Sequence, residues 1–137
     1  MNNIMGLFAK KKKMVLIIDD SPDVGEILKT RLEANAFTAL TALSGKDGIE
    51  KALTNPVDVI ILDIMMPEMD GFEVAKQLKK NDKTKTIPVI MLSALGSNFD
   101  PKHGETMAKA KELGVAGFVT KPYIPADVLS AINKALE

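Results

Sequence analysis

The chain has 137 residues, which suits one domain with a sizeable core and is too short for two. Its 18 basic and 18 acidic residues give a formal net charge of +0, and its aromatic residues are few, so we expect no direct binding of nucleic acid. No stretch approaches the roughly 18 apolar residues that cross a bilayer. The absence of cysteine excludes disulfides and thiolate metal sites, which suits a cytoplasmic protein. Any metal must be held by oxygen ligands or by His103.

The first residues stand apart from the pattern that follows. Residues 4–8 are mostly apolar and precede lysines at 10–13, which reverses the order found in a secretory signal. We interpret residues 1–13 as a flexible leader and residues 14–137 as the folded domain. A small amphipathic anchor on a membrane surface is the less favoured alternative, because short terminal segments are more often frayed.

The first predicted unit is a strand, an acidic loop and a helix. Residues 14–18 form an apolar run rich in β-branched side chains, which predicts a buried strand. The run stops at Asp19 and Asp20. Ser21 and Pro22 then resemble the N-cap and first position of a helix, and apolar residues follow at a spacing of three to four.

Two further units repeat this order. A weaker strand at 37–42 leads to Ser44 and Asp47, which are three residues apart as in a capping box. Residues 57–62 form the clearest central strand, and it ends at Asp63. A loop containing three methionines then leads into an amphipathic helix.

The remaining part of the chain contains two more units. Its predicted elements are a strand at 88–92, a helix near 105–113, a strand at 115–120 and a helix at 125–136. Ser93 follows the first of these strands, and Lys121 follows the second. Five strands therefore alternate with five helices along the chain.

Continuous apolar strands separated by amphipathic helices predict an α/β fold, a doubly wound five-stranded parallel sheet with helices on both faces. In such folds, ligands bind beyond the carboxyl ends of the strands. In the flavodoxin-like strand order 2-1-3-4-5, four strand ends converge on one pocket. This order would bring together Asp19, Asp20, Asp63, Ser93 and Lys121.

These groups suit phosphoryl transfer with a divalent cation. Crowded carboxylates raise the pKa of at least one of them unless a cation lies among them, and Mg²⁺ prefers oxygen ligands. Asp63 could be both a metal ligand and a nucleophile that forms an acyl phosphate. Lys121 and the hydroxyl of Ser93 could stabilise the phosphoryl oxygens. The set needs no general base.

The chain resembles the response-regulator receiver domains of two-component signalling, of which single-domain chemotaxis regulators are the simplest. The matching motifs are Asp19-Asp20, Asp63 with the following IMMPEMDG, Ser93 before alanine, and Lys121-Pro122. The resemblance covers about residues 14–136. It implies a cytoplasmic signalling domain that catalyses only its own phosphorylation and dephosphorylation, takes a phosphoryl group from a histidine kinase or phosphotransfer protein, and changes its affinity for a downstream protein. It also implies a monomer or a weak, phosphorylation-dependent dimer.

The resemblance assigns further roles at the metal. Asp20 and Asp63 would bind Mg²⁺ directly, and Asp19 would act through a water molecule. Met65 would contribute its backbone carbonyl to the same ion. We interpret Asp70-Gly71, at the end of this loop, as a turn into the next helix and not as a ligand.

The resemblance also implies a switch. Ser93 would move toward the phosphoryl group, and Phe118 matches the position whose aromatic ring turns inward on activation. Lys121 would be aimed by a cis peptide bond before Pro122. Residues 95–104 make this part of the chain longer than is usual in the family, which leaves the start of the fourth helix open.

Three other functions deserve comparison. An aspartyl phosphatase of the haloacid-dehalogenase type needs a second aspartate two residues after its nucleophile, where this chain has Met65. A flavodoxin-like flavin protein needs a phosphate-binding loop after the first strand, where this chain has the acidic DDSPD. A pseudo-receiver would serve only as a docking module, although the retention of every active-site group argues against it.

Overall fold

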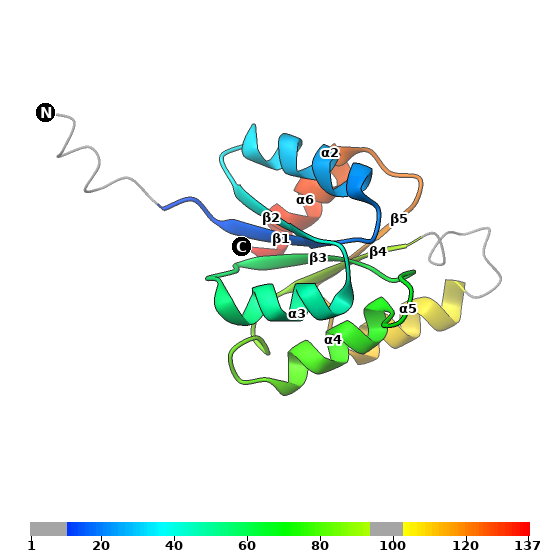
Figure 1. Cartoon of the computed structure of the whole chain (residues 1–137). Helices are drawn as coiled ribbons and strands as arrows, with labels where there is room; N and C mark the ends of the chain where they lie inside the picture. The colour runs from blue at the N-terminus through cyan, green and yellow to red at the C-terminus, as the bar shows by residue number, and fades with distance from the viewer. Residues whose placement is uncertain (1–10, 94–102) are drawn as a thin grey trace, which may run out of the picture.

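The computed structural model describes residues 11–93 and 103–137 (Figure 1). Its strands are β1 (Met14–Ile18), β2 (Thr38–Ala42), β3 (Val59–Asp63), β4 (Val89–Ser93) and β5 (Gly117–Thr120). Its helices are α2 (Pro22–Glu33), α3 (Gly45–Thr54), α4 (Gly71–Lys80), α5 (His103–Glu112) and α6 (Pro125–Ala135). The predicted alternation is confirmed. Most of the leader and of the predicted long loop at 95–104 lies outside the described residues.

The five strands form one parallel sheet in the order β2-β1-β3-β4-β5. Helices α2 and α6 cover one face of the sheet, and α3, α4 and α5 cover the other (Figure 1). This arrangement confirms the predicted doubly wound, flavodoxin-like α/β fold. Because all strands run the same way, their carboxyl ends lie along a single edge of the sheet.

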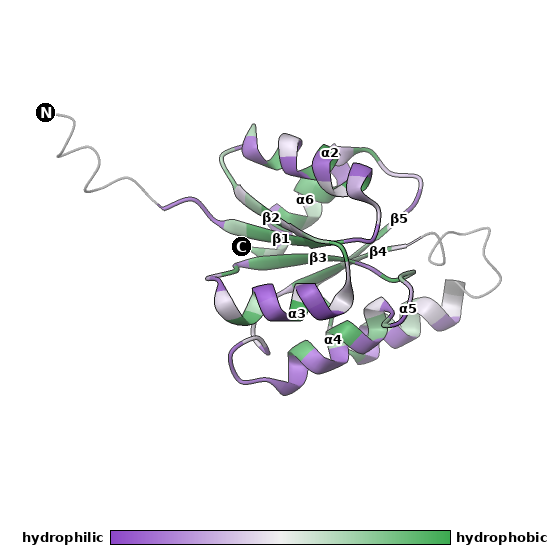
Figure 2. Cartoon of the chain, in the orientation of Figure 1, coloured by the Kyte–Doolittle hydropathy of each residue, from purple (hydrophilic) through white to green (hydrophobic). Residues whose placement is uncertain are grey.

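Each face of the sheet carries its own hydrophobic layer. Successive side chains of a strand point to opposite faces, so Val15 and Ile17 of β1 pack toward α2 and α6, whereas Leu16 and Ile18 pack toward the other helices. Figure 2 shows hydrophobic strands between helices whose outer surfaces are largely hydrophilic. The central strands are apolar throughout because both of their faces are covered. None of the helices in the described part of the chain is long and apolar enough to cross a bilayer.

Three helices begin at polar caps that also shape the carboxyl edge of the sheet. Ser21, Ser44 and Asp70 each accept a hydrogen bond from the backbone N–H three residues further on. Asp70 is therefore a helix cap, as predicted. Gly71 then packs so closely on the end of β3 that a Cβ atom would lie 2.5 Å from the carbonyl oxygen of Asp63. Only glycine fits there, and α4 is thereby fixed to the end of the central strand.

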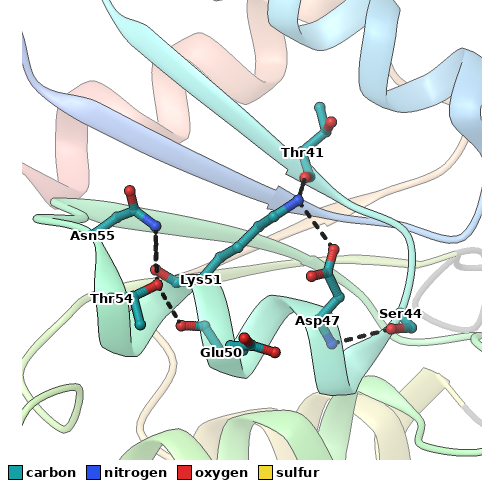
Figure 3. Close-up of polar contacts among 7 residues, drawn as sticks. All are labelled: Thr41, Ser44, Asp47, Glu50, Lys51, Thr54 and Asn55. Carbon is teal, nitrogen blue, oxygen red and sulfur yellow. Dashed lines mark hydrogen bonds and ion pairs between the residues drawn. The ribbon is translucent and has the colours of Figure 1, made fainter.

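Helix α3 is held to the edge strand β2 by the side chain of Lys51 (Figure 3). Its Nζ donates a hydrogen bond to the Thr41 carbonyl at 2.7 Å and lies 3.1 Å from the Asp47 carboxylate. Only one of the two hydrogen bonds of the predicted capping box is observed. The Ser44 hydroxyl accepts from the Asp47 N–H, but the Asp47 carboxylate pairs with Lys51. Lys51 thus donates a hydrogen bond to a backbone carbonyl of an edge strand. That carbonyl is then not available to pair with a strand of another chain.

Candidate active site

Polar residues from four strand ends meet at the carboxyl edge of the sheet. Asp19 follows β1, Asp63 ends β3, Ser93 ends β4 and Lys121 follows β5. The last two are linked directly, because the Lys121 N–H donates a 3.2 Å hydrogen bond to the Ser93 carbonyl. The side chain of Ser93 is fully buried. The parallel sheet therefore brings these predicted residues to one place.

Three carboxylates form a compact cluster at this edge. Asp19, Asp20 and Asp63 each offer an oxygen atom that lies within 4.8 Å of the others. Asp19 and Asp63 are only 2% and 3% exposed, whereas Asp20 is exposed to solvent. One oxygen of Asp19 accepts a 2.9 Å hydrogen bond from the Ser21 N–H. Asp19 Oδ2 and Asp63 Oδ1 are buried without a hydrogen-bond partner among the described residues, which is costly for a charged group.

The electrostatics of the cluster follow from this burial. The pKa of Asp63 is raised to about 6, first by loss of solvent and then by the negative charge of Asp19, while Lys121 opposes both. Burial also raises the pKa of Asp19, although the hydrogen bond from the Ser21 N–H lowers it in part. Lys121 Nζ lies 3.5 Å from Asp63 Oδ1, which makes an ion pair but is too long for a strong hydrogen bond. Its side chain is 34% exposed, so solvent screens part of its charge.

A divalent cation fits this cluster. The two buried oxygens that lack a hydrogen-bond partner are available as ligands, and Asp20 adds a third carboxylate from the solvent side. Mg²⁺ takes oxygen ligands, uses few carboxylates and keeps several water molecules. It would also remove the repulsion that raises the pKa of Asp63. The residues present therefore suit Mg²⁺, and Asp19, Asp20 and Asp63 would hold it.

The remaining predicted residues lie beside this centre. The side chain of Met65, in the loop after β3, is 57% exposed, so only its backbone is suited to the interior of the site. Phe118 lies in β5 opposite Met91 and is partly buried in the layer under α3, α4 and α5. The peptide bond between Lys121 and Pro122 is cis, as the resemblance implied.

Sequence reasoning missed Tyr123, which lies two residues after Lys121. Burial raises the pKa of its hydroxyl, and the negative charges of Asp19 and Asp63 raise it further, so the hydroxyl lies within electrostatic reach of the cluster. Its ring packs against the layer under α2 and α6. The only sequence signal was its position just after Lys121-Pro122, because no spacing of residues predicts which way a loop side chain turns.

Comparison with known proteins identifies relatives along nearly the whole chain. Residues 15–133 match the family model of the response regulator receiver domain. The chain is 34% identical over 124 residues to the alkaline phosphatase synthesis transcriptional regulatory protein PhoP of Bacillus subtilis, covering 90% of this chain and 48% of that protein. It is 34% identical over 122 residues to the response regulator SaeR of Staphylococcus aureus, covering 89% and 50%. The chain thus spans about half the length of these curated relatives.

Solved structures show the same fold. The chemotaxis protein CheY4 of Vibrio cholerae aligns with a TM-score of 0.82 and 30% identity, covering 91% of this chain and 99% of that chain. The receiver domain of the Francisella response regulator 1452 aligns with a TM-score of 0.80 and 31% identity, covering 91% and 97%. The chain belongs to the response regulator receiver domain family of two-component signalling. The resemblance drawn from its motifs is thereby confirmed.

Proposed function

We propose that this chain is a phosphoacceptor switch that takes a phosphoryl group on Asp63 from a histidine kinase or a phosphotransfer protein in the cytoplasm. The observation that carries the proposal is the burial of the Asp63 carboxylate. Asp63 is 3% exposed, ends a central strand, and has a buried oxygen without a hydrogen-bond partner in the described part of the chain. Such a group is costly to keep unless its oxygen serves as a ligand or a nucleophile.

Asp63 supplies the nucleophilic oxygen. A carboxyl with a pKa of about 6 is mostly ionised at neutral pH, so no other residue needs to remove a proton from it. The carboxylate oxygen forms a bond to phosphorus while the bond from phosphorus to the donor breaks, and the electron pair of that bond leaves with the donor. The product is an acyl phosphate on Asp63.

The neighbouring residues stabilise the charge of the transferred group. Lys121 Nζ, 3.5 Å from Asp63 Oδ1, is placed to donate to a phosphoryl oxygen, and the Ser93 hydroxyl would donate to another. Bound Mg²⁺ would offset the combined negative charge of the carboxylates and the phosphoryl oxygens. Asp20, Asp63 and the Met65 carbonyl would be its direct protein ligands, with Asp19 acting through water.

Phosphorylation would change the surface that a downstream protein contacts. Ser93 would move toward the phosphoryl group, and the ring of Phe118 would turn inward with it. Both residues belong to the part of the sheet next to α5 and α6, so the face formed by α5, β5 and α6 would change its affinity for a downstream protein. The chain would act as a monomer or as a weak dimer that forms on phosphorylation. It would catalyse only its own phosphorylation and dephosphorylation.

Intact mass after incubation with acetyl phosphate tests this proposal. The wild type should gain one phosphoryl group in the presence of Mg²⁺ and none after chelation of the metal. Asp63→Asn should gain none. Asp70→Asn is a matched control, because it removes a nearby carboxylate that caps α4 and asparagine caps a helix equally well. Phosphorylation that persists in Asp63→Asn would show that another residue is the acceptor.

The pseudo-receiver alternative makes a different prediction in the same experiment. A docking module would gain no phosphoryl group under any condition and would not bind beryllofluoride. A domain that accepts the group only from its own kinase would show no gain from acetyl phosphate but would still bind the mimic. The aspartyl phosphatase alternative predicts sustained release of phosphate from small substrates.

A further inference from the structure

Charged side chains are segregated along the strand direction. Because the sheet is parallel, the helices that the structure describes all begin at the active-site edge and end at the opposite edge (Figure 1). Each of them has an acidic residue in its first turn, namely Asp23, Asp47, Glu73, Glu105 and Asp127. Each also has a basic residue in its last turn, and these include Arg31, Lys79, Lys80 and Lys134. The net charge of zero therefore hides an excess of acidic first turns at one edge and of basic last turns at the other, although Glu33 and Glu112 also end their helices at the basic edge.

Three lysines extend the basic end beyond the helices. Lys11, Lys12 and Lys13 lead into β1 from the edge opposite Asp63, and all three are exposed. Basic residues in a last helical turn are explained by the helix dipole, but these lysines belong to no helix. The Lys13 carbonyl accepts a 2.9 Å hydrogen bond from the Thr38 N–H, which ties the run to the sheet. Figure 2 shows the segment that leads into β1 as hydrophilic.

The charge of these lysines is only partly compensated nearby. The ion pairs found in the described part of the chain involve Lys51, Lys85 and Lys121, and none involves residues 11–13. Asp58 lines the same shallow cleft of about 230 Å³, where its carboxylate accepts the Met14 N–H at 2.7 Å and offsets one of the three positive charges. The cleft is therefore bordered by lysines whose charge faces solvent.

We propose that this basic end, defined as Lys11–Lys13 with Arg31, Lys79, Lys80 and Lys134, docks on an anionic lipid surface. Each lysine near such a surface adds about 1 kcal/mol within a Debye length. Lipid is favoured over nucleic acid because the chain offers few aromatic residues to stack on bases.

The docked orientation follows from the same charge separation. The edge that holds Asp19, Asp20 and Asp63 is repelled by an anionic surface, so the domain would sit with its basic end down and its acidic edge away from lipid. The phosphoacceptor would stay open to a partner while the domain is held at a membrane. This role goes beyond phosphoryl transfer.

Flotation with vesicles tests the proposal on the full chain. One set of vesicles contains phosphatidylglycerol mixed with phosphatidylcholine, and the other contains phosphatidylcholine alone. Wild type should float with the anionic vesicles only, and high salt should release it. The combined variant Lys11→Gln, Lys12→Gln, Lys13→Gln should bind about 100-fold more weakly, which corresponds to about 3 kcal/mol for three lysines.

A charge-matched control distinguishes docking through the basic end from nonspecific attraction between positive charge and anionic vesicles. Lys29→Gln, Lys46→Gln and Lys76→Gln together remove the same charge from positions away from the basic end and should leave vesicle binding within about twofold of wild type. Equal loss in both triple variants, absence of binding to anionic vesicles, or preferred binding to duplex DNA at the same salt would each overturn the proposal. The thermal unfolding of each variant checks its fold independently of phosphorylation.

Discussion

Replacing Asp63 with asparagine should make the metal-free protein more stable at neutral pH. Burial and the charge of Asp19 raise the pKa of Asp63 from 3.8 to about 6. A carboxyl whose pKa is higher in the folded state binds its proton more tightly when folded, so folding loses stability as the pH rises from about 4 to about 6. A shift of about two pKa units corresponds to about 3 kcal/mol, and the whole cost is present above pH 6.

The expected gain is somewhat smaller than this cost. Asparagine keeps the shape of the side chain without its charge, but its amide is still a polar group that has to be buried. The attraction of Lys121 needs no separate subtraction, because it already lowers the pKa to the value of about 6. We therefore expect Asp63→Asn to add about 2 kcal/mol to the free energy of unfolding at pH 7.5. The gain should shrink to less than about 1 kcal/mol at pH 4, where the carboxyl of the folded wild type is protonated.

Urea unfolding followed by circular dichroism measures the effect. Wild type and Asp63→Asn are compared at both pH values with a chelator present, and Asp70→Asn serves as a control that should show no such gain. Added Mg²⁺ should stabilise the wild type more than the variant, since only the wild type retains the complete ligand set. A variant that is less stable than wild type at pH 7.5, or equally stabilised at both pH values, would refute the argument that buried repulsion raises the pKa of Asp63.

Three further predictions address the proposed function and its structural support. Lys121→Ala should keep most Mg²⁺ binding, seen as a metal-dependent rise in melting temperature, but should abolish the spectral change that beryllofluoride causes. Gly71→Ala should cost about 1–3 kcal/mol in urea unfolding, because its Cβ would lie 2.5 Å from the Asp63 carbonyl oxygen, whereas Gly104→Ala should be neutral or stabilising because nothing lies within 4 Å. Deletion of residues 1–12 should leave phosphorylation by acetyl phosphate unchanged by intact mass.

Much of the fold follows from the hydrophobic pattern. Residues 59–62 are apolar without alternation because both faces of a central parallel strand are covered, and this signal is hard to mistake. The predicted start of that strand was two residues early. The Val57 N–H donates a hydrogen bond to the Asn55 carbonyl, and the Asp58 carboxylate accepts one from the Met14 N–H. Both residues therefore make other hydrogen bonds just before β3 begins at Val59. Hydrogen bonds of this kind leave no trace in hydrophobic periodicity.

The site was predictable where it depends on topology. Asp19, Asp63, Ser93 and Lys121 mark the ends of four strands, and a parallel sheet leaves them no other place to meet. Tyr123 was not predictable, because its side chain is placed by loop packing and not by the sheet. Positions in the sequence fix which edge a residue reaches, but contacts in three dimensions fix the direction of its side chain.

The parallel topology also explains what a net charge of zero conceals. Acidic first turns and basic last turns cancel in a sum over the chain, but the sheet places them at opposite edges. The helix N-termini bring partial positive charge to the acidic edge, although the pKa of Asp63 remains raised there. In the proposed function, an edge of this charge would repel phosphoryl donors as well as anionic lipid, so a cation would be needed before a donor could approach Asp63. Metal dependence and orientation on a membrane would then share one cause, the common direction of the strands.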